Sequence, residues 1–220
     1  MTRLSMISCL LLGSVWFAGT TAAQQEPAGT AAAEASNAIG AADAAKAERF
    51  IRVKHNKVRE VLRKPDTPRR AEELTELLGE FLDYQRLTRL SLDKEWDKRS
   101  PRERQQFVTL LRQLVERQYQ RNMESTLDYK VKWVGTEPID TGVKVNSSAR
   151  SVTKKRQPPV AIDYSMSPDG DEWKVFDIFT DEVSLVKNYK RQFRRVIRDE
   201  GWDGLIDRMQ KKLKAEDNLL

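Results

Sequence analysis

The sequence predicts an α+β protein in which helices and an antiparallel sheet occupy different parts of the chain. Apolar residues recur at helical spacing between residues 46 and 127, alternate with polar residues between 129 and 179, and return to helical spacing between 184 and 213. Short turns containing glycine or proline separate the alternating segments, as in β-hairpins. We therefore expect one domain with a four-stranded antiparallel sheet and about five to six helices.

The first 45 residues do not show the pattern of a folded domain. Residues 1–23 combine a basic start, an apolar stretch from Leu4 to Phe17 and small residues at the end, which predicts a cleaved secretory signal peptide. Cleavage would remove Cys9, the one cysteine, and leave a chain suited to an oxidising compartment. Residues 24–45 are rich in alanine and interrupted by proline and glycine, so we expect a flexible linker before a domain spanning 46–220.

Two helices are predicted at the start of this domain. The first spans residues 46–64, carries a broad apolar stripe and ends at Pro65. Thr67 is a typical N-cap for the second helix, because Pro68 follows it at the first helical position. Leucine and phenylalanine then recur through residues 74–82 at the spacing of a buried face.

A shorter helix that contains Leu87, Leu90 and Trp96 is expected next. Residues 100–103 then combine a capping box with a proline at the first helical position, which predicts the start of a new helix. The apolar stripe of that helix runs from Phe107 to Met123. We expect its buried face to pack against the sheet or the other helices.

Four strands are predicted at residues 129–133, 143–145, 160–166 and 172–179, where apolar and polar residues alternate. Residues 135–142, which begin and end with glycine, are expected to form the turn between the first two strands. The other connections also carry turn residues. Short connections between consecutive strands favour an antiparallel meander.

The fourth strand has large apolar residues on both faces. Strict alternation places Trp173, Val175 and Asp177 on one face and Phe176 with Ile178 on the other. The sequence alone does not say which face points to the interior.

Two helices, residues 184–198 and 202–213, are predicted to close the chain, with Gly201 between them. The first has no acidic residue between Val186 and Arg198, so it either docks on an acidic partner or anionic lipid head groups or is an ordinary solvated face. Nucleic acid is not expected as a partner, because the aromatic residues of this helix fall on its buried stripe. The cations predicted to dock are Lys187, Lys190, Arg191, Arg194, Arg195 and Arg198.

Composition argues against several classes of enzyme and metal protein. Cys9 and His55 are too few for a structural zinc site, and the basic neighbours of His55 disfavour its charged form. The chain has no glycine-rich phosphate-binding motif, so no cofactor is expected. One enzymatic alternative stays open, a pocket carboxylate at Asp163 beside Tyr164 or at Asp177. The other interpretation is that these are ordinary residues of half-polar strands.

Several segments occur in the order and spacing of a known family. They are Val183–Val186 with Asn188–Tyr189 and Gln192–Phe193, Trp173–Ile178 before them, Phe81–Tyr84, Trp96 followed by Ser100–Pro101, Phe107, and Pro159–Val160 leading to Asp163–Tyr164. Behind a predicted signal peptide, this run across residues 46–213 resembles the MlaC family of periplasmic phospholipid-binding proteins, also called toluene-tolerance proteins.

The resemblance implies a curved, cone-shaped sheet of the nuclear-transport-factor-two-like kind, packed with helices around a lipid cavity. It also implies a monomeric, non-enzymatic periplasmic carrier with phospholipid as bound cargo. Such a carrier shuttles lipid between the outer membrane and an inner-membrane MCE-protein/ABC transporter complex, which maintains outer-membrane lipid asymmetry. An outer-membrane lipoprotein–porin complex is the second implied partner. A related branch is associated with hopanoid metabolism, so a hopanoid-type lipid is an alternative cargo.

We expect the lipid cavity to be lined by large apolar residues of the sheet and the facing helices. The sequence does not separate a cavity wall from a solid core. The residues predicted to bind lipid are Phe107, Leu111, Leu114, Val131, Trp133, Val145, Ile162, Tyr164, Val175, Phe176, Ile178, Val183, Tyr189 and Phe193.

Glu182 departs from the family pattern, in which glycine usually precedes the Val-Ser-Leu run. A glycine there adopts a positive φ at the turn from strand to helix without strain, whereas glutamate does not. We therefore expect this turn to be rebuilt, together with the cavity edge near Val183.

Overall fold

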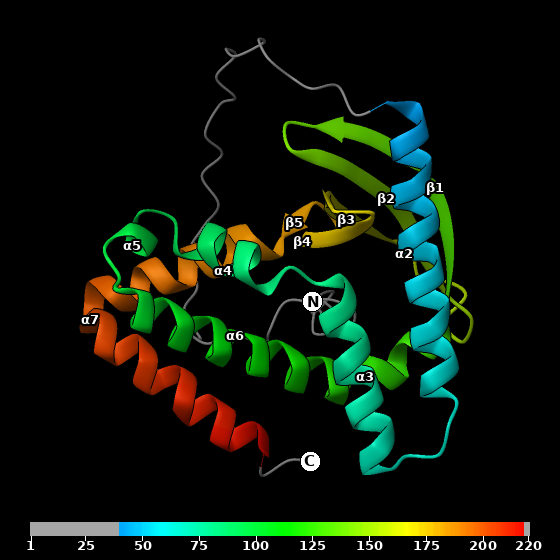
Figure 1. Cartoon of the computed structure of the whole chain (residues 1–220). Coiled ribbons are helices and arrows are strands. Elements are labelled where there is room, and N and C mark those ends of the chain that lie inside the picture. The colour runs from blue at the N-terminus through cyan, green and yellow to red at the C-terminus, as the bar shows by residue number, and fades with distance from the viewer. Residues whose placement is uncertain (1–39, 218–220) are drawn as a thin grey trace.

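A computed structural model describes residues 40–217, without the side chains of 121–124 and 217. The predicted signal peptide and residues 24–39 of the predicted linker lie outside the described residues. The elements, shown in Figure 1, are α2 (Ala41–Leu62), α3 (Pro68–Phe81), α4 (Tyr84–Leu92), α5 (Lys94–Asp97), α6 (Pro101–Asn122), the 3₁₀ segment η1 (Met123–Asp128), β1 (Tyr129–Ile139), β2 (Gly142–Ser151), β3 (Val160–Asp169), β4 (Glu172–Thr180), β5 (Val183–Ser184) and α7 (Leu185–Asp217).

The strands form one antiparallel meander in the order β1-β2-β3-β4-β5, which confirms the α+β class. The sheet has five strands rather than the predicted four, because Val183 and Ser184 pair with Thr180 and Phe179 at the end of β4. β1 and β5 are the edge strands of this sheet.

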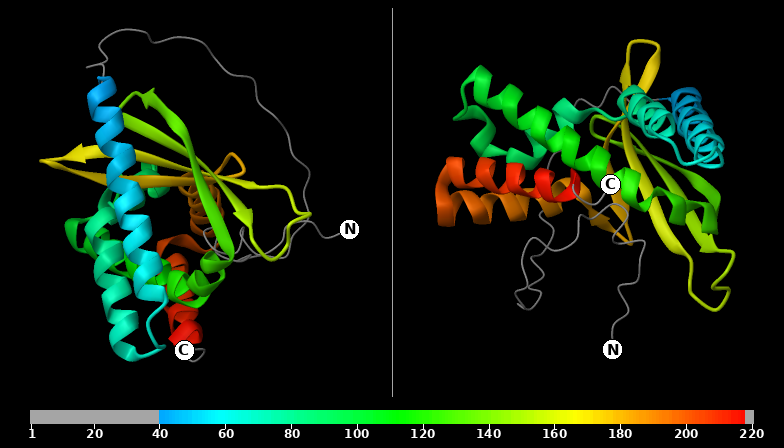
Figure 2. Two further views of the ribbon diagram at one scale, coloured as in Figure 1. Left: turned by 90° about the vertical axis from the view of Figure 1, so that its right-hand side faces the viewer. Right: turned by 90° about the horizontal axis from the view of Figure 1, so that it is seen from below.

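The helices lie in two groups beside the sheet. α2 runs across β1 and β2 and packs against α3 (Figure 1), whereas α4 and α6 pack against α7, which reaches the sheet at β4. Figure 2 shows α4, α6 and α7 gathered away from the long β1–β2 ribbon. The space between the two groups is where the sheet, α2 and the beginning of α7 face one another.

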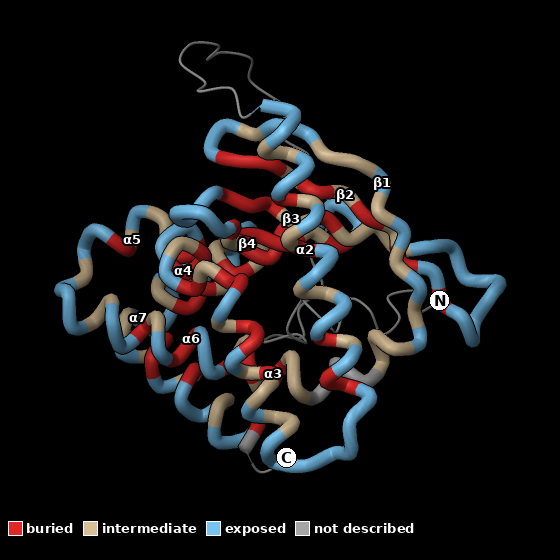
Figure 3. Tube along the Cα trace, turned by 45° about the vertical axis from the view of Figure 1, so that its right-hand side comes forward, coloured by how far each residue is buried: buried red, intermediate tan, exposed pale blue. Residues whose placement is uncertain are grey.

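Two clusters of buried apolar residues correspond to these two groups (Figure 3). The first cluster comprises Ala47, Ile51, Val58, Val61, Leu62, Leu74, Leu77, Leu78, Phe81, Leu82, Tyr84, Val143, Val145, Met166, Trp173, Val175 and Ile178. The second cluster comprises Leu87, Leu92, Trp96, Phe107, Leu110, Leu111, Leu114, Leu185, Val186, Tyr189, Phe193, Val196, Leu205, Ile206 and Met209.

The helix signals read from the sequence are confirmed where they involve capping. The Thr67 hydroxyl accepts the backbone N–H of Arg70 at 3.2 Å, so it caps α3. The Ser100 hydroxyl accepts the backbone N–H of Glu103 at 3.3 Å, and the Glu103 carboxylate accepts the backbone N–H of Ser100 at 2.7 Å. Gly201 takes a φ of 75° where the two predicted C-terminal helices meet within α7.

Other helix expectations need correction. α2 begins at Ala41 rather than at residue 46, so residues 41–45 of the predicted linker are helical. The added turn has an apolar contact of its own, because Ala44 packs against the first cluster beside the completely buried Ala47. Val53 of the predicted α2 stripe is 57% exposed, and Leu90 of the short helix is also exposed.

The first strand is longer than predicted. β1 passes through Gly135 and ends at Ile139, so the turn consists of two residues, 140 and 141. Val134 is the extra residue of a β-bulge, because Trp133 pairs with Ser147 while Gly135 pairs with Asn146. The side chain of Val134 is exposed, and the residues that follow it, from Gly135 onward, pair with β2 again.

A second bulge corrects the expected faces of β4. Ser165 pairs with Asp177 and Met166 pairs with Val175, which leaves Phe176 as the extra residue. Val175 and Ile178 therefore both belong to the first cluster, although strict alternation placed them on opposite faces. The face of β4 that points to the interior is the one that carries these two residues.

The turn from β4 to β5 has a positive φ at Glu182, the conformation that the sequence analysis did not expect of a glutamate. Asp181 has a φ of 47° and Glu182 a φ of 68°, so both central residues are left-handed. Thr180 pairs with Val183 across them, as in a two-residue hairpin. The expectation of a rebuilt turn is therefore wrong, and Glu182 adopts the conformation that glycine would favour.

Candidate functional site

A cavity lies between the sheet and the helices that face it. It encloses an empty volume of about 1190 Å³, a figure that counts the open space at its mouth. Both groups of helices and the sheet contribute to its wall. The helical part consists of Ile51, His55, Val58 and Arg59 of α2, Leu78 and Phe81 of α3, Leu87 of α4, Val115, Gln118 and Tyr119 of α6, and Leu185 and Tyr189 of α7, with Leu82 between α3 and α4. The rest consists of Thr126 of η1 and Tyr129, Val131, Ala149, Ile162, Tyr164 and Ile178 of the sheet.

The wall of the cavity is not buried to the same extent throughout. Leu78, Leu87 and Ala149 are each no more than 1% exposed and form its fully buried part, the deep wall. Arg59 and Tyr129 are partly exposed, and they lie at the junction of α2, η1 and β1. A ligand with one apolar and one polar end would therefore place its polar end beside these two residues.

Arg59 holds this junction together. Its guanidinium donates hydrogen bonds to the carbonyl oxygens of Thr126 at 2.9 Å and Tyr129 at 3.0 Å, and it reaches that of Leu127 at 3.5 Å. Partial burial, and then the nearby Arg63, lower the pKa of Arg59 from its usual value. The arginine remains a cation at the rim and fixes the end of η1 against α2.

His55 lies in the same wall, one turn before Arg59. The ring centroids of His55 and Trp133 lie 5.9 Å apart in a T-shaped arrangement, and those of Trp133 and Tyr164 lie 6.1 Å apart. Burial lowers the pKa of His55, the charge of Arg59 lowers it further, and a hydrogen bond with Asn56 opposes them. The imidazole is therefore neutral at neutral pH and forms part of an aromatic wall.

Tyr119, Tyr164 and Tyr189 add buried phenol groups to the wall. Burial raises the pKa of Tyr119 and of Tyr164 well above the usual phenol value, and it raises the pKa of Tyr189 to about 12. These phenols stay neutral at physiological pH. Since the lining residues include no aspartate or glutamate, the wall carries no negative charge.

The two carboxylates considered for catalysis are elsewhere. Asp163 accepts the backbone N–H of Ser147 at 3.3 Å and lies 3.6 Å from the amine of Lys144, and it does not line the cavity. Its neighbour Tyr164 does line it, which follows from alternation along β3.

Asp177 is buried at the junction between β4 and α7. One carboxylate oxygen accepts the backbone N–H groups of Ile178 at 2.9 Å and Val186 at 3.0 Å, and the other accepts the hydroxyl of Ser184 at 2.6 Å. Burial raises the pKa of Asp177, and these hydrogen bonds oppose the rise. Ser184 in turn caps α7 by accepting the N–H of Lys187 at 2.9 Å. Asp177 thus has a structural role that needs no substrate.

The structure brings together part of the predicted lipid-binding set. Val131, Ile162, Tyr164, Ile178 and Tyr189 line the cavity. The other predicted residues lie outside its wall: Phe107, Leu111, Leu114 and Phe193 in the second cluster, Val145 and Val175 buried in the first, Trp133 behind His55 and Tyr164, Phe176 beneath the guanidinium of Arg86, and Val183 exposed.

The sequence reasoning missed the contribution of α2. Ile51, His55 and Val58 stand at positions i, i+4 and i+7 of that helix, so they share one face and all line the cavity. This spacing was the available signal. His55 was set aside because its sequence neighbours are basic, yet those neighbours point elsewhere around the helix.

The cations predicted to dock lie on α7, and most of them have partners. Lys190 and Arg194 both approach Asp93, at 3.0 and 3.3 Å, and Arg198 is 2.8 Å from Asp199. Arg195 lies 3.9 Å from Asp199, and Arg191 donates to the Asn188 side-chain oxygen at 3.5 Å. Lys187 is the remaining member of the predicted set and is exposed.

The part of the chain that the structure describes shows neither a membrane-spanning helix nor a metal-binding cluster. Within residues 40–217, no helix is both long and apolar enough to span a bilayer. In the same part of the chain, no cluster of three or more histidine, cysteine, aspartate or glutamate side chains is arranged to hold a metal ion.

The fold and the site together define an α+β domain with one apolar, carboxylate-free cavity between sheet and helices. The chain belongs to the MlaC protein family, whose family model matches residues 53–211. Its fold is similar to that of the phospholipid-binding protein from Ralstonia solanacearum, solved in complex with a phospholipid, with a TM-score of 0.68. The two sequences are 22% identical over 78% of this chain and 99% of the other. None of the curated proteins compared with the chain matches it.

Proposed function

We propose that this protein is a periplasmic carrier that holds phospholipid acyl chains in the cavity between its sheet and its helices. The observation that carries the proposal is the wall of that cavity, which is mainly aliphatic and aromatic, contains no carboxylate and includes the partly exposed Arg59 and Tyr129. Membership of the MlaC family and similarity to a phospholipid-bound structure support it. A carrier role, rather than catalysis, suits a wall without carboxylates.

Burial of the acyl chains provides the free energy for such a complex. A two-chain lipid exposes about 30 methylenes, each worth roughly 0.8 kcal/mol, so transfer through water faces a barrier on the order of 24 kcal/mol. A dry wall such as that formed by Leu78, Leu87 and Ala149 removes methylenes from water without recognising any particular head group.

The rim determines how the lipid is oriented. Arg59, Thr126 and Tyr129 provide a cation, a hydroxyl and a phenol where the cavity opens. A hydrated phosphate head group stays at this end, because the deep wall offers it no hydrogen-bond partners. The acyl chains then extend towards α3, α4 and α7.

The carrier would exchange lipid between the outer membrane and an inner-membrane MCE-protein/ABC transporter complex, with a lipoprotein–porin complex as its outer-membrane partner. The α7 cations Lys187, Lys190, Arg191, Arg194, Arg195 and Arg198 are the surface proposed to dock on the transporter complex. A monomer is expected, because the cavity is complete within one chain. If Arg191→Glu, Arg194→Glu and Arg195→Glu together leave delivery to that complex unchanged, the docking assignment is wrong.

The proposed function is tested by native mass spectrometry of the purified protein, followed by solvent extraction and identification of bound lipid. We expect near one phospholipid per chain. Ala149→Phe places a large side chain on the cavity wall and should reduce the bound lipid at least several-fold. Val196→Ala changes a buried residue of the second cluster that does not line the cavity, so it should leave the bound lipid unchanged.

The alternatives give different results in the same experiment. A hopanoid-type lipid in the extract would assign the protein to the related branch and replace phospholipid as cargo. A protein that is empty and takes up no lipid from vesicles would exclude the carrier function. An enzyme with the same fold would then have to use a carboxylate outside the cavity wall, since Asp163 and Asp177 both lie outside it.

A further inference from the structure

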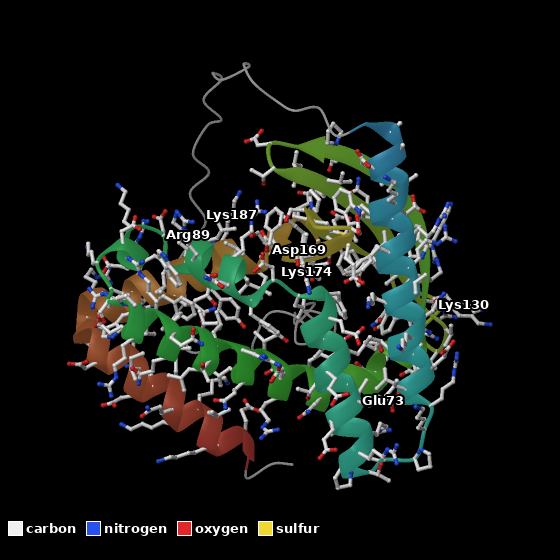
Figure 4. All side chains as sticks on the ribbon, viewed as in Figure 1. Glu73, Arg89, Lys130, Asp169, Lys174 and Lys187 are labelled. Atoms are coloured by element: carbon white, nitrogen blue, oxygen red, sulfur yellow. The ribbon has the colours of Figure 1, made fainter. Side chains whose placement is uncertain are left out.

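The outer face of the β1–β2 ribbon carries a second concentration of positive charge. Lys130 and Lys132 alternate with the cavity residue Val131, so they point to the opposite side of the sheet. Arg150 stands directly across from Lys130 in the ladder. All three cations are exposed, and Figure 4 shows Lys130 projecting away from α2 and the helices.

These cations lack the partners that the α7 cations have. Among the described residues, no salt bridge or hydrogen bond involves the side chain of Lys130, Lys132 or Arg150. Like charges directly opposite each other on adjacent strands destabilise the pairing. The pair Lys130 and Arg150 therefore costs stability that no neighbouring carboxylate in the described part of the chain offsets.

The connection between β2 and β3 extends the same charge. Lys154, Lys155 and Arg156 follow one another there, and all are exposed. Figure 2 shows this loop projecting beyond the end of the sheet, away from the helices. It carries the cations furthest from the body of the protein, where they can meet a surface first.

Exposed aliphatic side chains lie among these cations. Val134, the bulged residue of β1, is 64% exposed, and Val152 at the base of the loop is 38% exposed. Interfacial amphipathic helices bind lipid surfaces with the same combination of Lys and Arg beside apolar side chains. An acidic protein surface would be met by the cations alone and gives no role to the two valines.

The basic face is also connected to the cavity. A shallow depression on it is lined by Lys130, Lys132, Val134, Ser148, Arg150 and Pro159, and Val131 borders both this depression and the cavity. Because β1 is an edge strand, the two spaces are separated by one strand only. A surface held against this face would lie beside the partly exposed end of the cavity.

We propose that the outer face of the β1–β2 ribbon, with the 152–156 loop, docks the protein on an anionic phospholipid membrane surface. The cations meet lipid phosphates and anionic head groups, while Val134 and Val152 enter the interfacial layer. This goes beyond the proposed function, because attachment to a membrane surface requires no lipid in the cavity.

The test is flotation of the protein with vesicles of phosphatidylcholine, with and without phosphatidylglycerol, at low and high salt. We expect binding to the anionic vesicles only, and weaker binding at high salt. Each cation near an anionic surface changes the partition coefficient about 5-fold, so Lys130→Gln, Lys132→Gln and Arg150→Gln together should lower it on the order of 100-fold. Bound lipid, measured by mass spectrometry on the same variant, should not change.

The matched control removes the same charge from α7. Lys187→Gln, Arg191→Gln and Arg195→Gln together should bind the anionic vesicles as the unchanged protein does, within the small effect of net charge. Equal loss in both triple variants would show that net charge alone attracts the protein and would overturn the proposal. If the β1–β2 triple variant bound the anionic vesicles as tightly as the unchanged protein, the proposal would also be overturned. The partner of this face would then be an acidic protein rather than a membrane. Changing Val134→Ser should weaken binding even at low salt, whereas a purely electrostatic contact would not respond.

Discussion

The two apolar clusters of this protein are built differently. The second cluster is packed with aromatic rings. The ring centroids of Phe107 and Phe193 lie 5.2 Å apart in a T-shaped arrangement, and Tyr189 stacks on Phe193 with ring centroids 5.3 Å apart. The first cluster packs the outer parts of α2, α3 and the sheet but surrounds a cavity at its centre. Atoms that line an empty space lose contacts on one side, so a cavity is maintained only where neighbouring packing provides the stability.

The two regions meet in α7. Leu185 and Tyr189 belong to the solid second cluster, yet they also line the cavity. The part of the cavity wall that α7 provides is therefore held in place by the packing of α4, α6 and α7. This division of labour predicts that stability and lipid content respond to different substitutions.

The largest expected effect is the loss of stability in Phe107→Ala. Phe107 is completely buried in the second cluster and touches the rings of Phe193 and Trp202. Truncating such a residue typically costs about 3–5 kcal/mol, through lost burial and the void left behind. Urea unfolding followed by tryptophan fluorescence or circular dichroism measures the change.

The contrast between the two clusters predicts a smaller loss of stability for a substitution on the cavity wall. Ala149→Phe, on the cavity wall, is the matched change, because it fills existing space and should alter the free energy of unfolding by less than about 1.5 kcal/mol. A larger loss in Ala149→Phe than in Phe107→Ala would mean that the cavity region, rather than the second cluster, stabilises the fold.

The next effect is expected at the junction between the two regions. Asp177→Ala leaves the Ser184 hydroxyl and the N–H groups of Ile178 and Val186 without their acceptor, which should cost about 1–3 kcal/mol. Asp177→Asn keeps an acceptor for the two N–H groups and should recover most of that loss. Thermal unfolding of both variants at neutral pH measures the difference.

Asp177 also gives stability a pH dependence with a definite sign. Its pKa is raised in the folded protein, so between the unfolded and folded pKa values the folded state binds more protons. This contribution is present below the unfolded pKa and is lost as pH rises through the folded pKa. Asp177→Asn should remove this part of the pH dependence. An unchanged slope in the variant would show that other groups produce it.

Local signals in the sequence were sufficient for the capped starts of α3 and α6, but not for the start of α2. The caps at Thr67 and Ser100 involve residues three apart, so they can be read without knowing the fold. The two bulges could not, because an extra residue such as Val134 or Phe176 is defined only by its partner strand. The glycines at 135 and 142 also made β1 look shorter than it is, whereas the edge strand continues through Gly135 and tolerates Pro138.

The cavity was predictable as a type of site but not in its full membership. Alternation placed Val131, Ile162 and Tyr164 on the interior face correctly. Phe107 and Phe193 have the same composition and periodicity, but they fill a solid cluster, because whether apolar faces meet or leave space depends on the angle between helices and sheet. That angle is a property of the tertiary structure.

The smallest expected effect is a gain in stability at the turn that connects the two regions. Glu182 has a φ of 68°, where a residue other than glycine pays roughly 1–2 kcal/mol, and glycine loses about 0.4–1 kcal/mol through the greater freedom of the unfolded chain. Glu182→Gly should therefore stabilise the protein by about 0.5 kcal/mol, measured as a shift of the urea midpoint. Asp181→Gly is the control, since Asp181 is also left-handed but its carboxylate accepts the N–H of Ala161 at 3.0 Å. We expect no gain there, because relief of the backbone is offset by the lost hydrogen bond. A destabilised Glu182→Gly protein would mean that the Glu182 side chain, rather than its backbone, supports the joint between β4 and α7.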